Sequence, residues 1–179
     1  MILEVDDAIS LKLLEEKDAD DIFCTIDSQR PYLGRWLPFV ELTREQKDTE
    51  TFIKAILEAP KENFEYVFTI RFKNEFAGLA GFRGTDKLNR KTEIGYWLSE
   101  PFQGLGIATR TVRRLCEFAF SDRGMNRIKI CCAVGNMESR AIPKRLGFKY
   151  EGREREGELL SGGKYTDLEI YSLLNRESL

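Results

Sequence analysis

One short turn, rich in glycine and set between a strand-like and a helix-like run, constrains this chain most. It consists of Gln103, Gly104, Leu105, Gly106, Ile107 and Ala108. The first backbone N–H groups of a helix have no partner within the helix, and the helix dipole places positive charge at the same end. Glycine has no Cβ atom that would hold an anion away from these groups. The turn therefore predicts a strand, an anion-binding loop and a helix from about residue 107, although such turns also occur without a ligand.

The spacing in this turn, Gln-x-x-Gly-x-Ala, differs from two common nucleotide loops. It has no Gly-Lys-Ser/Thr ending, as a phosphate-binding NTPase loop would, and no third glycine with a downstream acid, as a dinucleotide-binding fold would. It resembles the acyl-CoA pyrophosphate loop of the GNAT superfamily of N-acetyltransferases. Further matches resemble the RimJ/RimL subgroup, which acetylates the N-termini of ribosomal proteins: Glu93 to Leu98, Asn136 with Ser139, Gly147 with Phe148, and Arg30 to Pro38.

Hydrophobic periodicity predicts the elements around the loop. Alternating apolar residues indicate a strand over 9–14, and helical spacing after an acidic first turn indicates a helix from about residue 17, broken near Pro31 and Pro38. A capping box at Thr43 and Gln46 predicts another helix that ends before Pro60. Further strands are expected over 64–72, 76–83, 91–98 and 127–134, helices from 107 and over 138–146, and a last hairpin over 148–155 and 164–174.

This order predicts an α/β (α+β) fold in one domain over residues 1–179. We expect a central mixed, mostly antiparallel sheet with helices on both faces. The GNAT resemblance adds two splayed parallel strands, which here would be residues 92–98 and 127–134.

The same resemblance implies acetyl-CoA as co-substrate and assigns its binding residues. In that family the pantetheine arm lies between the splayed strands. Backbone groups of Tyr96, Trp97 and Leu98 would hold the arm and polarise the thioester carbonyl, and residues 103–108 would bind the pyrophosphate. Asn136 would reach the cofactor, although as a helix N-cap it is also explained without one. A fully paired central strand is the alternative for residues 96–98, and no metal is implied.

Histidine is absent from the chain, so a general base must be a carboxylate, a lysine, a cysteine, a tyrosine or water. Glu93 is the first candidate, because on a strand it would share a face with Gly95 and Trp97. Apolar neighbours there would tune the carboxylate for proton transfer near neutral pH. A solvated charge at the strand start is the alternative. The rivals are water and three acids of the last hairpin, Asp167, Glu169 and Glu158, of which Glu158 is expected to be exposed or to face the substrate.

Many members of the resembled family carry a tyrosine seven residues after the asparagine, as the acid that protonates the leaving thiolate. Pro143 occupies that position here. Because proline has no N–H for the carbonyl of Ser139, the helix would be locally open at Ser139. RimL-like enzymes are similar in using serine there. We therefore expect Ser139 to protonate or hydrogen-bond the thiolate, with an ordinary serine in a first helical turn as the alternative.

Composition argues against several other classes of protein. The net charge of −2 argues against nucleic-acid binding through bulk charge, and no apolar run approaches the roughly 18 residues that would span a bilayer. The N-terminus has no basic segment or cleavage site, so a cytoplasmic location is expected. The cysteines lack zinc-site spacing and are expected to be buried reduced thiols: Cys24, Cys116, Cys131 and Cys132.

These observations together predict an acetyl-CoA-dependent N-acetyltransferase in which an amine attacks the thioester directly. The resemblance implies a protein N-terminal amine as acceptor, with ribosomal proteins as candidates. The alternatives are an acetyltransferase for a polyamine, an antibiotic or an aminoacyl nucleotide, a mononucleotide-binding regulator, and a non-catalytic acyl-CoA-binding module, which the proline in place of tyrosine favours. The sequence leaves open the acceptor and whether the protein is a monomer or a homodimer.

Overall fold

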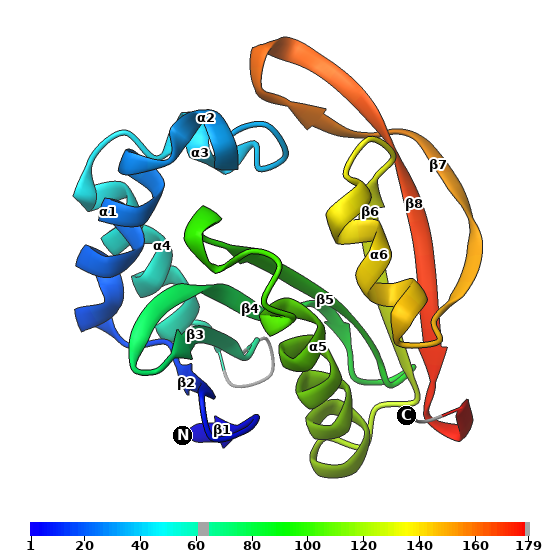
Figure 1. Ribbon diagram of the computed structural model, residues 1–179. Coiled ribbons are helices and arrows are strands. Elements are labelled where there is room, and N and C mark those ends of the chain that lie inside the picture. Colours follow the sequence, from blue (N-terminus) through cyan, green and yellow to red (C-terminus); the bar gives the residue numbers. More distant parts are fainter. Residues whose placement is uncertain (61–64, 178–179) are drawn as a thin grey trace.

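One mixed β-sheet forms the centre of the molecule. The computed structural model describes residues 1–60 and 65–177 (Figure 1). In this part of the chain eight strands lie side by side in the order β1-β2-β3-β4-β5-β6-β8-β7. Their bounds are β1 Ile2–Glu4, β2 Ile9–Leu13, β3 Val67–Phe72, β4 Glu75–Asp86, β5 Lys91–Leu98, β6 Arg127–Ala133, β7 Lys149–Leu160 and β8 Lys164–Leu174. Neighbouring strands run antiparallel except β5 and β6, which confirms the expected mixed, mostly antiparallel sheet.

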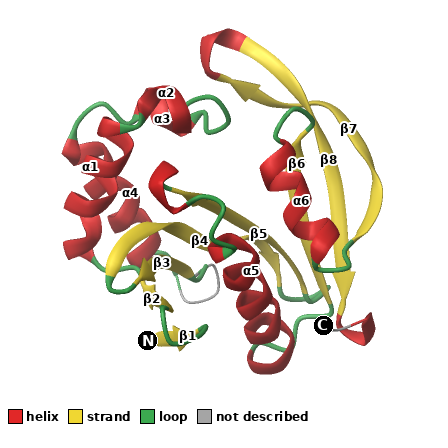
Figure 2. Cartoon of the chain, viewed as in Figure 1, coloured by secondary structure: helices red, strands yellow, loops and turns green. Residues whose placement is uncertain are grey.

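Helices cover both faces of this sheet, as expected (Figure 2). The helices are α1 Ala19–Ser28, α2 Arg30–Leu33, α3 Phe39–Leu42, α4 Gln46–Leu57, α5 Ile107–Glu117 and α6 Met137–Arg145. The 3₁₀ turns are η1 Glu16–Asp18, η2 Glu100–Phe102, η4 Ser161–Gly163 and η5 Asn175–Glu177, and η3 Phe118–Asp122 is a π-helical segment that continues α5. On one face, α1 and α4 pack against Leu79 and Trp97. On the other face, α5 and α6 pack against Ile94 and Ile130. Because side chains of a strand alternate between faces, strands β4 and β5 contribute to both cores.

The parallel pair at the centre separates along its length. β5 and β6 are paired over three positions, Lys91 to Glu93 with Arg127 to Lys129. Beyond Glu93, residues 94–98 of β5 continue to pair with β4 on their other side, and the described residues form no further ladder with β6. The predicted splay is therefore confirmed, and it leaves one edge of β5 without a neighbouring strand.

The last two strands form a long hairpin that rises beyond the rest of the sheet. In Figure 1 its tip (orange to red) arches toward α2 and α3. Two register shifts, between Tyr150 and Gly152 and between Glu154 and Glu158, interrupt the pairing of β7 with β8. Such irregularities bend and twist an edge strand, which accounts for the curvature of the hairpin.

Most local expectations agree with the structure. The turn between β3 and β4 has positive φ values at Lys73 and Asn74, the conformation of a tight hairpin. The expected strand over 64–72 is described from residue 65 and starts at Val67, and residue 64 lies outside the described residues. Strand β1, which the sequence analysis did not predict, has three residues and is too short to show alternation.

Two expectations were wrong. The capping box of α4 is formed by Glu45 and Asp48. The hydroxyl of Thr43 instead donates to the carbonyl of Phe39, which ends α3 and leaves Thr43 before the cap. The cysteines are all free, but Cys24 is exposed and only part of the set is buried, because Cys24 lies on the outer side of α1.

Candidate functional site

The glycine turn has the geometry of an anion site. Both glycines adopt the left-handed region, with φ of 74° at Gly104 and 71° at Gly106, and Gly106 caps α5. A Cβ atom at Gly104 would meet no other atom within 4 Å, so the turn requires glycine there for its backbone conformation and faces open space. Within the described residues, no backbone N–H from Gly104 to Thr109 donates to a protein acceptor, and the first turn of α5 carries no acid. These donors and the helix dipole converge on the open side of the turn.

Gln103 faces away from these donors, toward α2. Its side-chain amide donates to the hydroxyl of Tyr32, which in turn donates to the carbonyl of Leu98 at 3.3 Å. Burial raises the pKa of Tyr32, so its hydroxyl stays protonated. Tyr32 thus ties α2 to the end of β5 and to the anion loop. Sequence analysis missed this link, since Tyr32 lies 71 positions from Gln103 in the chain.

Tyr96 and Trp97 point to opposite faces of β5. The Trp97 ring packs against Phe76, with ring centroids 5.9 Å apart, so its side chain belongs to the core under α1 and α4. The Tyr96 hydroxyl donates to the carbonyl of Ser139 at 3.1 Å. That carbonyl has no partner within α6 because Pro143 lies four residues later and has no N–H. The open position predicted in α6 is therefore present, and a phenol from β5 fills it.

The side chain of Ser139 joins the same cluster. Its Oγ lies 3.2 Å from the Tyr96 hydroxyl and donates to the sulfur of Cys132 at 3.4 Å. Its backbone N–H donates to Oδ1 of Asn136 at 3.1 Å, which confirms Asn136 as the N-cap of α6. Burial raises the pKa of Tyr96 and of Cys132, so both are neutral near pH 7. This cluster of neutral hydroxyl and thiol groups lies beside the splay.

Trp36 closes the turn that precedes α6. A Cβ atom at Gly135 would lie 2.7 Å from Cη2 of Trp36, so the indole ring rests directly on the Gly135 backbone. A side chain at position 135 would therefore displace the Trp36 ring. The segment between α2 and α3 is thus fixed next to the turn that presents Asn136.

Glu93 has different surroundings from those expected. Its side chain is 12% exposed, and both of its oxygens are bound to cations. Oε1 accepts from Nε of Arg83 at 2.7 Å, and Oε2 lies 2.8 Å from Nζ of Lys129. The expectation of apolar neighbours was wrong because the register places Arg83 of β4 and Lys129 of β6 directly opposite Glu93. Cross-strand pairing between the neighbouring predicted strands 76–83 and 91–98 was the available signal for Arg83.

The three rival carboxylates differ in their contacts. Glu169 is buried and accepts from Nε and a terminal nitrogen of Arg140, each at 2.7 Å, and from the Tyr171 hydroxyl, so it is fully bound within the protein. Asp167 accepts from the backbone N–H of Glu156 at 2.9 Å and shapes the bend of β7. Both therefore have structural roles.

Glu158 is the exception among these acids. It is half-buried, and in the described part of the chain its carboxylate has neither a hydrogen bond nor an ion pair. Burial raises its pKa, the charge of Glu93 adds to the effect, and Arg83 opposes it. Glu158 is therefore an available carboxylate whose pKa responds to the charges of Arg83 and Glu93. No sequence pattern separates it from its neighbours in the hairpin.

Cys131 lies beside Lys129 and Glu93, and burial raises its pKa to about 11. A thiol with this pKa is protonated at neutral pH and is a poor nucleophile. The residues 1–60 and 65–177 contain no cluster of three or more His, Cys, Asp or Glu side chains that could hold a metal ion. The chemistry of the site consists of carboxylates, hydroxyl groups and unpaired backbone donors.

Comparison with known proteins identifies the family. A family model described as an acetyltransferase (GNAT) domain matches residues 9–149. The chain belongs to the GNAT acetyltransferase family. The putative ribosomal N-acetyltransferase YdaF of Bacillus subtilis (strain 168) is 37% identical over 178 residues, which cover 97% of this chain and 95% of that protein.

Solved structures of GNAT proteins share the whole fold. The ribosomal L7/L12 alpha-N-protein acetyltransferase RimL in complex with coenzyme A has a TM-score of 0.91 at 26% identity, covering 97% of this chain and 98% of that chain. The microcin C7 self-immunity acetyltransferase MccE in complex with acetyl-CoA and AMP has a TM-score of 0.88 at 29% identity, covering 95% and 94%. The expected GNAT fold, with its splayed parallel pair, and the expected enzyme class are therefore confirmed. No helix in the described residues is long and apolar enough to cross a membrane.

Proposed function

We propose that this protein transfers the acetyl group of acetyl-CoA to the N-terminal α-amine of a protein, with ribosomal proteins as the first acceptors to test. The observation that carries the proposal is the row of unpaired donors from Gly104 to Thr109 at the end of a strand whose edge is open. A pyrophosphate would lie on the unpaired donors of the loop, and an extended pantetheine arm would lie along the open edge of β5. The relatives described as ribosomal N-acetyltransferases support the choice of acceptor.

We assign cofactor binding and the steps of acetyl transfer to different residues of the chain. Loop residues Gly104 to Ala108 bind the pyrophosphate, and Gln103, which is held by Tyr32, fixes the start of this loop. Backbone groups of residues 96–98 position the thioester and stabilise its oxyanion. The amine attacks the thioester carbonyl directly, so no covalent enzyme intermediate forms. Asn136 orients Ser139 through the helix cap.

Proton transfer requires one base and one acid. Glu93 is the proposed base, acting after its contacts with Arg83 or Lys129 loosen in the presence of the acceptor. Glu158 is the second candidate, because it is unpaired and its raised pKa suits proton transfer near neutrality. Ser139 is the proposed donor to the leaving thiolate, since its hydroxyl is fixed beside the splay by Tyr96.

The proposed acceptor also bears on location and assembly. A ribosomal acceptor would place the protein in the cytoplasm, and the family resemblance leaves both a monomer and a homodimer in the proposal. The net charge of −2 supports an acceptor that is bound as a protein and not through nucleic acid.

The test is thiol release from acetyl-CoA in the presence of amines. Peptides with free and blocked N-termini, spermidine and an aminoacyl nucleotide are offered separately to the wild-type protein and to Glu93→Gln and Glu158→Gln. We expect release with free N-termini and at least a hundredfold loss in kcat in one of the two variants. Thiol release with spermidine or with the aminoacyl nucleotide, and with none of the peptides, would show that the acceptor is a small amine. CoA binding without release with any amine would mark a non-catalytic module.

A further inference from the structure

An open pocket of about 700 Å³ is lined by residues of α2, of α3 and of the turn η4 at the tip of the β7–β8 hairpin. Figure 1 shows this tip on the same side of the molecule as α2 and α3. The reaction described above uses none of its side chains. Three arginines, Arg30, Arg35 and Arg44, line it together with Glu41 and Ser161. Its charged groups show what kind of acceptor it suits.

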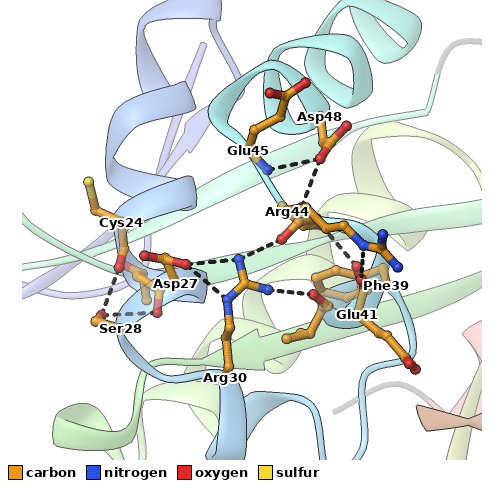
Figure 3. Close-up of polar contacts among 12 residues, drawn as sticks. Cys24, Asp27, Ser28, Arg30, Phe39, Glu41, Arg44, Glu45 and Asp48 are labelled. Carbon is orange, nitrogen blue, oxygen red and sulfur yellow. Dashed lines mark hydrogen bonds and ion pairs between the residues drawn. The ribbon is translucent and has the colours of Figure 1, made fainter. Parts of the chain in front are cut away.

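Arg30 has a structural role in this pocket. Its guanidinium donates to Asp27 at 2.9 Å and to the carbonyls of Val40 and Thr43 at 2.9 and 2.7 Å (Figure 3). These bonds neutralise its charge and fix α3 against the end of α1. Arg30 therefore holds the pocket wall and is not available to a ligand.

Arg35 and Arg44 are different, because both are exposed and neither has a carboxylate within ion-pair distance in residues 1–60 and 65–177. Nε of Arg44 donates to the carbonyl of Glu41 at 3.4 Å, and the guanidinium of Arg35 lies 5.0 Å from the centroid of the Trp36 ring. The carboxylate of Glu41 offsets one of these two charges. The pocket is left with an excess of one positive charge.

A buried polar atom points to a ligand at the same place. In the described residues, the hydroxyl oxygen of Ser161 is buried without a hydrogen-bond partner, and Ser161 lines the pocket from the hairpin side. A buried hydroxyl without a partner is unfavourable, so one that faces a pocket is satisfied when a polar ligand binds. A carboxylate or a peptide carbonyl would supply the acceptor.

The hairpin connects the pocket to Glu158, the second proposed base. Glu158 precedes Ser161 by three residues at the end of β7. Since a strand rises about 3.3 Å per residue, about 10 Å separates the two positions. An extended peptide covers the same length with about three residues. On the other wall, Trp36 places Arg35 next to the Gly135 turn that leads into α6.

We infer that this pocket selects acceptor peptides with an acidic side chain about three residues after the reacting amine. The inference rests on the proposed function and adds the substrate class. Carboxylates Glu93 and Glu158 receive the amine end, while Arg35, Arg44 and the Ser161 hydroxyl receive the acidic side chain. A polyamine carries positive charge at both ends and meets the two arginines unfavourably.

The experiment compares kcat/KM for peptides that share their first two residues and differ at positions three to five, where they carry aspartate, glutamine or lysine. It uses the wild-type protein, the double variant Arg35→Glu with Arg44→Glu, and the control Arg176→Glu. Arg176 is an exposed cation in η5 at the opposite end of the molecule. The pocket charge can also be raised with Glu41→Gln.

For the wild type and the control we expect the aspartate peptides to be preferred over the lysine peptides by roughly three- to tenfold, with the preference falling as salt rises. The double variant should reverse this order, and Glu41→Gln should increase the preference. The same peptide order in the wild type and the double variant, with both proteins folded, would overturn the inference while leaving the acetyltransfer intact. Absence of acetylation of every peptide by the wild type would overturn the proposed function itself.

Discussion

A valine at position 106 tests the anion loop most sharply. Gly106 has φ of 71° and ψ of 7°, and a Cβ atom there would approach only Nε of Arg110, at 3.9 Å. The folded protein therefore has room for the side chain, and its cost arises from the left-handed backbone, about 1–3 kcal/mol of stability. On the ligand side the new methyl groups would stand over the unpaired N–H groups of the loop. Losing two or three hydrogen bonds to a charged phosphate would cost about 3–6 kcal/mol of CoA binding, which is roughly 10²–10⁴ in Kd.

The chain offers a matched control for this strain. Gly124, in the loop before β6, has φ of 63° and no atom within 4 Å of a Cβ position. Gly124→Val should lose about the same stability and keep CoA affinity. The assay is calorimetric titration with CoA, paired with denaturant unfolding of both variants. The reasoning is refuted if folded Gly106→Val binds CoA as tightly as the wild type, or if Gly124→Val weakens binding equally.

Three further predictions concern the carboxylates and Ser139. Glu93→Gln should lower kcat by roughly 10²–10⁴ near neutral pH with acetyl-CoA binding nearly unchanged, and wild-type turnover would remove Glu93 as the base. Ser139→Ala should lower kcat by about ten- to a hundredfold because a thiolate leaves with modest help, whereas a lower Tm with normal turnover would leave Ser139 only structural. Because the hydrogen bond from Arg127 lowers the pKa of Glu151 to about 2, Glu151→Gln should cost about 0.5–1 kcal/mol at pH 7, as seen by urea unfolding. Glu151 contributes stability above its ordinary pKa of 4.5 and loses it as pH falls toward 2, so a difference from the wild type that persists below pH 2 would contradict this account.

Sequence patterns were sufficient for the elements and for the loop that carries the proposed ligand. The two glycines of residues 103–108 indicated a turn between a strand and a helix, and Asn136 was recognisable as a helix N-cap. The gap in α6 followed from Pro143 alone, since the missing N–H depends on no other residue. Each of these is a local property of the chain.

The surroundings of the acids depended on contacts between distant strands. Arg83 and Lys129 reach Glu93 because of the register of β4 and β6, and a shift of one residue would have moved either cation to the other face. The phenol of Tyr96 meets Ser139 across 43 positions of the chain. Glu158 differs from the other acids of its hairpin through the bend at the register shift between Glu154 and Glu158. Hydrophobic periodicity contains no information about these contacts between distant strands. The sequence therefore limits the general base to a few carboxylates without choosing between them.

Intact-mass spectrometry can follow acetyl transfer to a protein N-terminal amine. A peptide with a free N-terminus and an internal lysine is incubated with the protein and acetyl-CoA that carries an isotope-labelled acetyl group. We expect one labelled acetyl group per peptide, located by fragmentation on the α-amine, with one free CoA thiol released for each. Label on the lysine side chain alone, or no label on any peptide or small amine while CoA binds, would contradict it.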